Sequence, residues 1–492
     1  MHRESRRTVW RARKLWWVAV ALAGGCAAGP DYRRPQAEVP PAWKPEAPWR
    51  EAAPSDSALK GAWWRAFRDD TLDPLVERAL AENQNLRVAA ARLDQARGQL
   101  TVARADLFPW VGLSAAASRG RTSANRPRAA YSLQNQSTVQ NDFIVGSALR
   151  YEADLFGRVR RQVEGARASA QQADADFENT RLLMTADLVT DYFALRELDA
   201  EIAVVRNSLD LQRDALRFII SRHDLGFATG LDLAQQQALA DSSATQLELL
   251  GNQRAQYEHA IATLTATPAP SFTIAAALST ASLPAVPVGV PSDLLQRRPD
   301  VASAERAMAA ANARIGVARA AYYPSIELGS VFGEPGAGWQ SNALSTLFAA
   351  PSRLWSLGLS VTQTLFDAGK TRANVRISAA DYTAAVATYR QTVLTAMQEV
   401  ENGITGLASL DRAVKQADAG VSSAQEAFDL ATVRYTGGVD TYLEMITAQQ
   451  VLLGNQRQAV QVRGQQFATA VYLVKALGGG WGEDPRQLSL RN

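Results

Sequence analysis

Several residue types are scarce or widely scattered in this sequence of 492 residues, and each scarcity excludes a class of protein. The single cysteine, Cys26, excludes a disulfide framework, a four-cysteine zinc site and a CxxC redox motif. The three histidines, His2, His223 and His259, lie too far apart in sequence to predict a histidine metal cluster. No nucleophile elbow is present either, so the sequence predicts neither an enzyme nor a bound cofactor or metal.

Excess positive charge is confined to the first fourteen residues. They hold six cations against one acid, a balance of +5, whereas the whole chain has a formal net charge of +3, so the remainder carries about −2. This removes the main support for nucleic-acid binding. An apolar run follows at 15–23, far shorter than the ~20 residues that a membrane-spanning helix needs. Because small residues then precede Cys26, the order is typical of a secretory signal, which we predict over 1–25.

Cys26 stands where this leader ends, as in a bacterial lipobox, in which the cysteine sulfur is acylated and becomes the new N-terminus. Leu22 lies four residues before it, with Ala23 at the position where leucine is commonest; ordinary cleavage near an incidental cysteine is the alternative. Acyl chains contribute ~0.8 kcal/mol per buried CH₂, so a multiply acylated Cys26, with palmitate among its chains, would be a firm anchor. Ala27, in place of aspartate, favours transfer to the outer membrane. We therefore predict a lipidated N-terminal segment over 26–61.

The rest of the sequence repeats itself once. Two pairs of segments match in the same order, 102–109 with 317–324 and 222–232 with 434–444. A proline-rich stretch separates the halves, so the pattern predicts a tandem duplication. The predicted parts are a first repeat at 62–266, a link at 267–292, a second repeat at 293–481 and a C-terminal tail at 482–492.

Each repeat contains the same predicted series: a helix, two strands and a long helical hairpin. Alternation of apolar and polar residues predicts half-buried strands. Apolar residues at steps of three and four from Val400 to Tyr435 are typical of a supercoiled helix. Gly226, Gly437 and Gly438 mark the hairpin turns and are expected to serve backbone conformation. The strands are expected at about 111–118, 143–155, 325–332 and 354–366, and the hairpins at 158–266 and 370–478. A glycine-rich stretch at 333–338 is interpreted as an extracellular loop.

Four strands are too few to close a membrane barrel. Outer-membrane barrels begin at about eight strands, and open strand edges are not tolerated in lipid. The strands would therefore close by sharing between chains: two chains give eight and three give twelve. Only a wider barrel leaves a channel. A soluble sheet with a plain coiled coil is the alternative, which the predicted lipidation and the duplication disfavour.

Four motifs follow one another across nearly the whole chain. They are residues 26–35, residues 293–301 with Ala304 and Glu305, residues 434–443, and residues 477–481. Together they resemble the TolC/OprM-type outer membrane factors, in the NodT-like subgroup. The resemblance implies a mainly α chain with a transmembrane β-barrel: a homotrimer with a twelve-stranded barrel, four strands from each chain, continuing into a long α-helical coiled-coil tunnel through the periplasm. It also implies a tripartite system with a periplasmic adaptor and an inner-membrane RND transporter.

The same resemblance assigns residues to a gate. In the family, the periplasmic mouth of the tunnel is closed near the hairpin turns with the help of acidic residues. Asp232 and Glu444 occupy matching places in the two return helices, and Tyr435 is placed to bond across the mouth. Thr447 stands where many relatives carry a second acid. For both carboxylates, a first-turn acid stabilised by the helix dipole is the alternative.

Four aromatic residues in or beside the predicted strands are expected to contribute to membrane girdles, with core packing as the alternative. They are Trp110, Phe143, Tyr151 and Trp355.

The predicted function is an outer-membrane exit duct, lipid-anchored and barrel-inserted, that passively conducts drugs or other toxic small molecules. A conduit for type I polypeptide secretion and a structural envelope-spanning lipoprotein are the alternatives. The lipobox and the Gly-Gly-Gly-Trp ending at 478–481 favour efflux.

Overall fold

The computed structural model describes residues 28–33, 61–125, 138–284, 298–329 and 336–479. The predicted signal, Cys26, the end of the predicted link (285–292) and the C-terminal tail lie outside these residues. The chain divides into two compact units, and both repeats contribute to each unit. The first unit comprises Met1–Pro35, Leu93–Ala173 and Ala304–Thr388, and the second comprises Gln36–Arg92, Asp174–Ser303 and Tyr389–Asn492. The compact units therefore differ from the two repeats predicted at 62–266 and 293–481.

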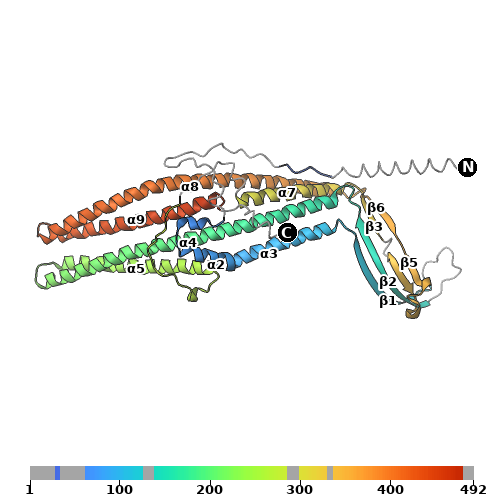
Figure 1. The fold of residues 1–492 in the computed structure, drawn as a ribbon, viewed down its shortest axis with the longest axis horizontal. Helices are drawn as coiled ribbons and strands as arrows, with labels where there is room; N and C mark the ends of the chain where they lie inside the picture. Colours follow the sequence, from blue (N-terminus) through green and yellow to red (C-terminus); the bar gives the residue numbers. More distant parts are fainter. Residues whose placement is uncertain (1–27, 34–60, 126–137, 285–297, 330–335, 480–492) are drawn as a thin grey trace. The chain divides into compact units, whose positions relative to one another are not determined.

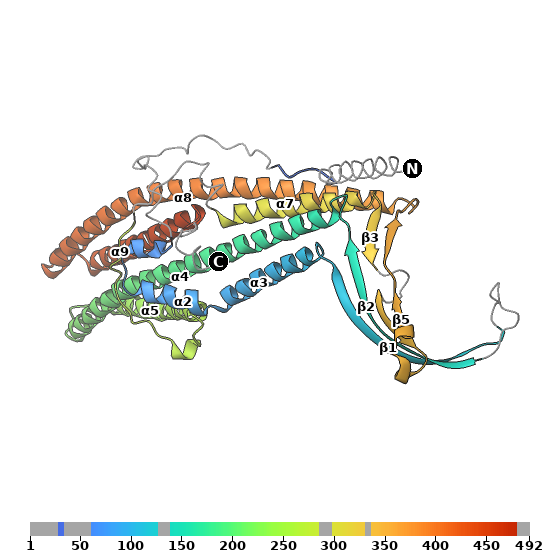
Figure 2. The same cartoon turned by 45° about the vertical axis from the view of Figure 1, so that its right-hand side comes forward.

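The first unit contains an antiparallel sheet, in which β2 is the longest strand (Figure 1). Its order is β5-β4-β2-β3-β6, and β1 also pairs with β2 along its whole length. Figures 1 and 2 both show β1 and β2 side by side. The strands are β1 (Trp110–Thr122), β2 (Thr138–Glu152), β3 (Ser325–Gly329), β4 (Ala337–Ser341), β5 (Arg353–Trp355) and β6 (Gly358–Thr362).

The strand expected at 354–366 is wrong as a single element. The structure divides it into β5, which pairs with β4, and β6, which pairs with β3 and ends at Thr362. Alternation continues across the break because it reports which side a residue faces and not which strand is its partner. The expected loop at 333–338 is also partly wrong, since Ala337 and Gly338 begin β4.

Helices make up most of the described chain. The first hairpin consists of α4 and α5, and the second of α8 and α9. In Figures 1 and 2 each returning helix runs beside its partner. The helices are α2 (Leu72–Glu82), α3 (Gln84–Ala105), α4 (Arg158–Asp224), α5 (Gly230–Leu264), α7 (Pro299–Ala320), α8 (Lys370–Thr436) and α9 (Tyr442–Ala476), with short 3₁₀ helices η1 (Trp63–Phe67), η2 (Ala269–Ser271), η3 (Leu344–Thr346) and η4 (Ala350–Ser352).

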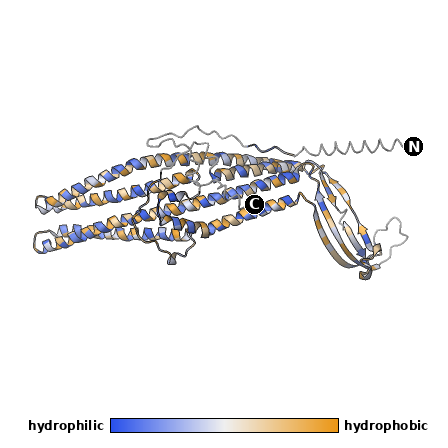
Figure 3. Ribbon diagram, in the orientation of Figure 1, coloured by the Kyte–Doolittle hydropathy of each residue, from blue (hydrophilic) through white to orange (hydrophobic). Residues whose placement is uncertain are grey.

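None of the long helices is uniformly hydrophobic (Figure 3). Figure 3 shows hydrophobic and hydrophilic residues interleaved along α4, α5, α8 and α9. This is the pattern of helices that bury one stripe against their neighbours. Within the described ranges, we find no helix with the combined length and apolar character of a membrane span.

The core of the second unit is built around the aromatic side chains of η1. Trp63 and Phe67 are buried, and the Phe67 ring centre lies 4.9 Å from that of Phe193 on α4 and 6.3 Å from that of Phe467 on α9. Aromatic pairs at such separations contribute ~0.5–1.5 kcal/mol beyond the burial of their area. The segment before α2 thus joins a helix of the first repeat to a helix of the second.

Candidate functional site at the tips of the helical hairpins

The two hairpins close with turns of the same backbone geometry. Gly226 and Gly438 have φ angles of +80° and +73°. In each turn, the amide after the glycine donates to the carbonyl four residues before the glycine, at 2.8 and 2.9 Å. Glycine is favoured at such a helix end because a Cβ atom is strained in the left-handed region. Gly437 is not left-handed, and its amide donates to the Val433 carbonyl at 2.9 Å.

Asp232 caps the N-terminus of α5. Its carboxylate accepts hydrogen bonds from the amide and the hydroxyl of Thr229, at 2.9 and 2.8 Å. The Thr229 hydroxyl accepts in turn from the Asp232 amide at 3.2 Å. This reciprocal arrangement is a capping box, which satisfies two amides that the helix leaves unpaired. A role in starting α5 therefore accounts for the contacts of Asp232.

Glu444 occupies the matching place on α9 but differs in its contacts. It is exposed, and within the described residues no hydrogen bond or ion pair to its carboxylate is found. Thr441, the residue before α9, makes no side-chain cap bond. The hydroxyl of Thr447 donates to the Leu443 carbonyl of its own helix at 2.8 Å. The structure therefore does not bring Asp232 and Glu444 into one shared cluster.

Tyr435 connects the two hairpins near their tips. Its hydroxyl accepts a hydrogen bond from the Arg222 guanidinium at 3.4 Å, and the guanidinium carbon lies 5.5 Å from the ring centre. The ring centre of Tyr435 also lies 5.2 Å from that of Tyr442. A cation–π contact at an exposed site contributes only ~0.5–1 kcal/mol. This link is therefore weak.

A chain of buried polar groups lies next to these rings. The Tyr442 hydroxyl donates to the Gln236 side-chain oxygen at 2.7 Å, and the Gln236 amide group donates to the Gln212 carbonyl at 2.6 Å. Both glutamines have 0% exposure. Burial raises the pKa of the Tyr442 hydroxyl above its usual range, which keeps it protonated as a donor. The chain thus ties α9 of the second hairpin to α5 and α4 of the first.

Sequence reasoning did not single out Arg222, Tyr442 or Gln236. Tyr442 belongs to one of the family motifs, but its partner is 206 residues away in sequence. Polar residues at positions where a coiled coil normally places apolar ones were the available signal. The surrounding apolar cluster has buried members from both hairpins. These are Ile219, Leu239, Tyr442, Met445 and Ile446.

A second polar region is a cavity of about 550 Å³ lined by α4, α5 and α9. Glu197 lines it, and its carboxylate lies against Gly464, where a Cβ atom would overlap it. Burial, together with the nearby charge of Glu201, raises the pKa of Glu197 to about 7. Burial also raises the pKa of Asp191 to about 6. Glu201 itself is 3% exposed and pairs with Arg457 at 2.8 Å.

The predicted girdle residues lie at three levels of the sheet. Trp110 is 57% exposed and stands opposite Arg150, beside Tyr151. Phe143 lies eight residues before Tyr151 on β2. Trp355 pairs with Ala337, which is opposite Ser147, so its level is midway between the other two. Eight residues of strand rise ~26 Å, comparable with the ~25 Å apolar band of outer-membrane barrels.

Metal-binding groups do not gather in the described part of the chain: no cluster of three or more His, Cys, Asp or Glu side chains there is arranged to hold a metal ion. The polar groups of the tips are arranged to hold helices together.

Comparison with known proteins gives one consistent result. The family model for outer membrane efflux proteins matches residues 75–267 and 290–479. The chain is 32% identical to the toluene efflux pump outer membrane protein TtgC of Pseudomonas putida, over 96% of each chain. It is 33% identical to outer membrane protein OprJ of Pseudomonas aeruginosa, over 95% of each chain. The outer-membrane channel OprN aligns with a TM-score of 0.83 at 30% identity, covering 93% of this chain and 100% of that chain.

These similarities confirm the fold class, the outer-membrane location and the efflux function predicted from the sequence motifs. The working unit is a trimeric channel that serves a periplasmic adaptor and an inner-membrane RND pump. The alternatives of a secretion conduit and of a purely structural lipoprotein are accordingly set aside. The chain belongs to the outer membrane efflux protein family, whose members are passive channels and not enzymes.

Proposed function

We propose that this chain conducts small, largely apolar toxic molecules across the outer membrane, and that the tips of its two hairpins form the periplasmic gate. The substrate class is supported by the similarity to TtgC, which is named for toluene efflux. The observation that carries the gate is the connection of the two hairpins near their turns by a few polar contacts. These are Arg222 with Tyr435, and Tyr442 with Gln236.

The strength of these contacts suits a gate that a partner opens. A neutral hydrogen bond contributes ~0.5–1.5 kcal/mol net, and the Arg222–Tyr435 contact at 3.4 Å is near the long limit for one. A partner shifts such an equilibrium by its difference in affinity for the open and closed states. An adaptor that binds the open state more tightly by a few kcal/mol would therefore separate the hairpins, and the channel would need no chemistry of its own.

Glu444 is the better of the two candidate carboxylates for lining the pore. Its side chain is exposed and has no partner in the described chain, whereas Asp232 is held by the cap of α5. In a trimer, three copies of Glu444 would form a ring of carboxylates, which favours cations over anions. Replacement of the second acid by Thr447 would leave this ring with less charge than in many relatives.

The function is tested by deleting the gene from its host and measuring accumulation of N-phenyl-1-naphthylamine, an apolar fluorescent probe. Deletion should increase accumulation severalfold, and re-expression of the chain should restore the original level. Crosslinking of the tagged chain in cells should capture an adaptor and an RND transporter. Unchanged accumulation, with capture of an ATP-driven exporter and loss of a secreted polypeptide, would instead identify a secretion conduit.

A further inference from the structure

The sequence carries the same kind of residue pair at four places where a helix meets a strand. Each pair consists of two large apolar or aromatic residues in succession. The pairs are Leu107-Phe108 before β1, Leu155-Phe156 after β2, Tyr322-Tyr323 before β3 and Leu365-Phe366 after β6.

The register of the sheet places these four pairs at one end of the strands, side by side. Trp110 at the start of β1 is opposite Arg150 near the end of β2. Glu152 at the end of β2 is opposite Glu327 of β3, and the first residue of β3 is opposite Thr362, the last of β6. The strand ends that connect to helices are therefore neighbours.

Most of these side chains are exposed. Phe108 is 69% exposed, Tyr322 is 50% exposed, and Leu365 and Phe366 are 92% and 89% exposed. Phe156 is stacked on Tyr323, with ring centres 4.8 Å apart. Exposed large apolar groups gathered at neighbouring strand ends mark a surface that is covered in the working protein. In an outer-membrane protein, such a surface at the ends of the strands fits the membrane interface.

Cations without an acidic partner lie within seven residues of these pairs. Arg104 and Arg319 occupy equivalent positions, each four residues before the second member of a pair. Lys370 and Arg372 lie in the first turn of α8. All four are exposed, and within the described residues none of them forms an ion pair.

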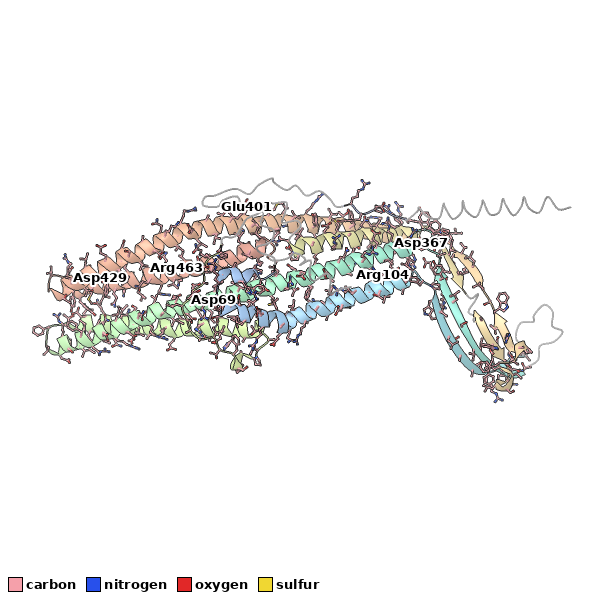
Figure 4. The ribbon with its side chains drawn as sticks, in the orientation of Figure 1. Asp69, Arg104, Asp367, Glu401, Asp429 and Arg463 are labelled. Atoms are coloured by element: carbon pink, nitrogen blue, oxygen red, sulfur yellow. The ribbon has the colours of Figure 1, made fainter. Side chains whose placement is uncertain are left out.

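The fourth helix–strand connection is different, because its cations are already neutralised. Arg158 binds Glu152 at 2.7 Å, and Arg160 lies 3.3 Å from Asp154. The nearest acids at the other connections are also engaged. Asp106 accepts from Gln162 at 3.1 Å. Asp367 accepts from the amides of Gly369 and Thr371 and so caps α8. Figure 4 labels Arg104 and Asp367, each where its helix meets the strands.

We propose that the four residue pairs together with Arg104, Arg319, Lys370 and Arg372, here called the junction collar, bind the phosphate headgroups of anionic phospholipids in the inner leaflet of the outer membrane. The apolar pairs enter the interface between headgroups and acyl chains. The four cations, at most about two helical turns away, extend their flexible side chains to the phosphates. A phospholipid is favoured over free phosphate because the apolar pairs would gain nothing from an ion alone.

The test uses the full-length purified trimer in mixed micelles with either phosphatidylglycerol or phosphatidylcholine. The readout is the midpoint of thermal dissociation of the trimer and the number of lipids retained in native mass spectrometry. Phosphatidylglycerol should raise the midpoint by several degrees and remain bound. The variant with R104Q, R319Q, K370Q and R372Q should lose at least half of both effects. The matched control replaces four exposed, unpaired cations elsewhere, with R87Q, R213Q, R390Q and R412Q, and should keep both effects.

Three outcomes would overturn the proposal. Equal stabilisation by both lipids would show that the junction collar binds acyl chains without recognising the headgroup. Equal loss in the two quadruple variants would show a general effect of net charge. Stabilisation by inorganic phosphate alone, to the same extent as by phosphatidylglycerol, would identify an ion site. If the quadruple variant fails to assemble, the pair R104Q and R319Q is measured in the same way.

Discussion

Glu197 is a carboxyl group whose pKa is raised by burial, so that it stays largely protonated below about pH 7. Its pKa is raised from 4.5 to about 7, first by burial and then by the charge of Glu201. The other charged or titratable groups that face the same cavity are Asp191 and Tyr257, with Arg457 paired to Glu201. A carboxyl with a raised pKa binds its proton more tightly in the folded state. The folded state therefore loses stability as the pH rises from about 4.5 towards 7.

Replacing this residue by Glu197→Gln should flatten the pH dependence of stability. We expect the wild-type melting temperature to fall between pH 5 and pH 8, and the variant to lose less over the same range. The difference corresponds to a free energy on the order of 1 kcal/mol, since solvent screens a half-buried group. Thermal melts at pH 5, 6, 7 and 8 measure it. Parallel curves for the two proteins would mean that Glu197 is already ionised at pH 5.

Residues at matching sequence positions acquire different roles at the two turns. Asp232 and Glu444 match in the sequence repeat, yet Asp232 is held in a capping box with Thr229 while Glu444 is exposed. The difference arises because an aspartate reaches back to the residue before its helix, whereas no comparable bond forms at Thr441. The sequence correctly located both carboxylates near the turns but could not separate these roles.

At the scale of elements, close helix contacts depend on single small residues. Gly403 of α8 is buried, and a Cβ atom there would lie 2.9 Å from a side-chain carbon of Leu473 and 3.3 Å from its Cα atom, on α9. The two helices of this hairpin therefore approach each other closely at this point. A Cβ atom added to Gly454 on α9 would instead have no neighbouring atom within 4 Å.

The substitutions Gly403→Ala and Gly454→Ala should accordingly act in opposite directions. Gly403→Ala forces the helices apart and should lower the free energy of unfolding by ~1–3 kcal/mol. Gly454→Ala, the matched control, should raise it by ~0.5–1 kcal/mol through helix propensity alone. Denaturant unfolding followed by circular dichroism measures both. Stabilisation by both substitutions would show that the hairpin adapts at Gly403 without cost.

The hydrogen bond between Tyr442 and Gln236 is the strongest candidate for the contact that holds the two hairpins together in the closed state. Tyr442→Phe removes the 2.7 Å hydrogen bond and leaves a buried oxygen of Gln236 unpaired. Such a loss costs ~1–3 kcal/mol, so the closed state should weaken and the open probability in planar bilayers should rise about tenfold. Tyr382→Phe, which alters no hydrogen bond found in the described chain, is the control. Unchanged single-channel currents in the Tyr442 variant would remove it from the gate.

At the scale of the whole molecule, the first described residues, which follow the predicted lipidation site in sequence, form hydrogen bonds to the segment that joins β2 to α4 and to α4 itself. The Ala28 amide donates to the Phe156 carbonyl at 2.9 Å, and Asp31 pairs with Arg161 at 2.7 Å. Gly29 rests on Gly316 of α7, since a Cβ atom on Gly29 would lie 2.6 Å from the Gly316 Cα atom. Ala28, two residues after the cysteine at which an acyl group is predicted, is therefore held at the boundary between β2 and α4.

We propose that Cys26 carries this acyl group. Cys26→Ser should abolish incorporation of radiolabelled palmitate in cells and leave an unprocessed precursor, because acylation requires the sulfur atom. The label is measured on the immunoprecipitated chain, with Cys26 intact as the reference. Unchanged labelling and processing in the variant would show that the lipobox prediction is wrong.

Local patterns in the sequence determined the helices, the hairpin turns and the family. Heptad spacing indicates which side of a helix is buried, and glycine marks a turn that needs a positive φ angle. Both can be recognised without knowing which residues they contact. Only the tertiary structure decided which strands pair at 353–362, that each compact unit takes parts from both repeats, and that Tyr442 meets Gln236. These features depend on groups far apart in sequence. The periodicity of one segment carries no information about its partners.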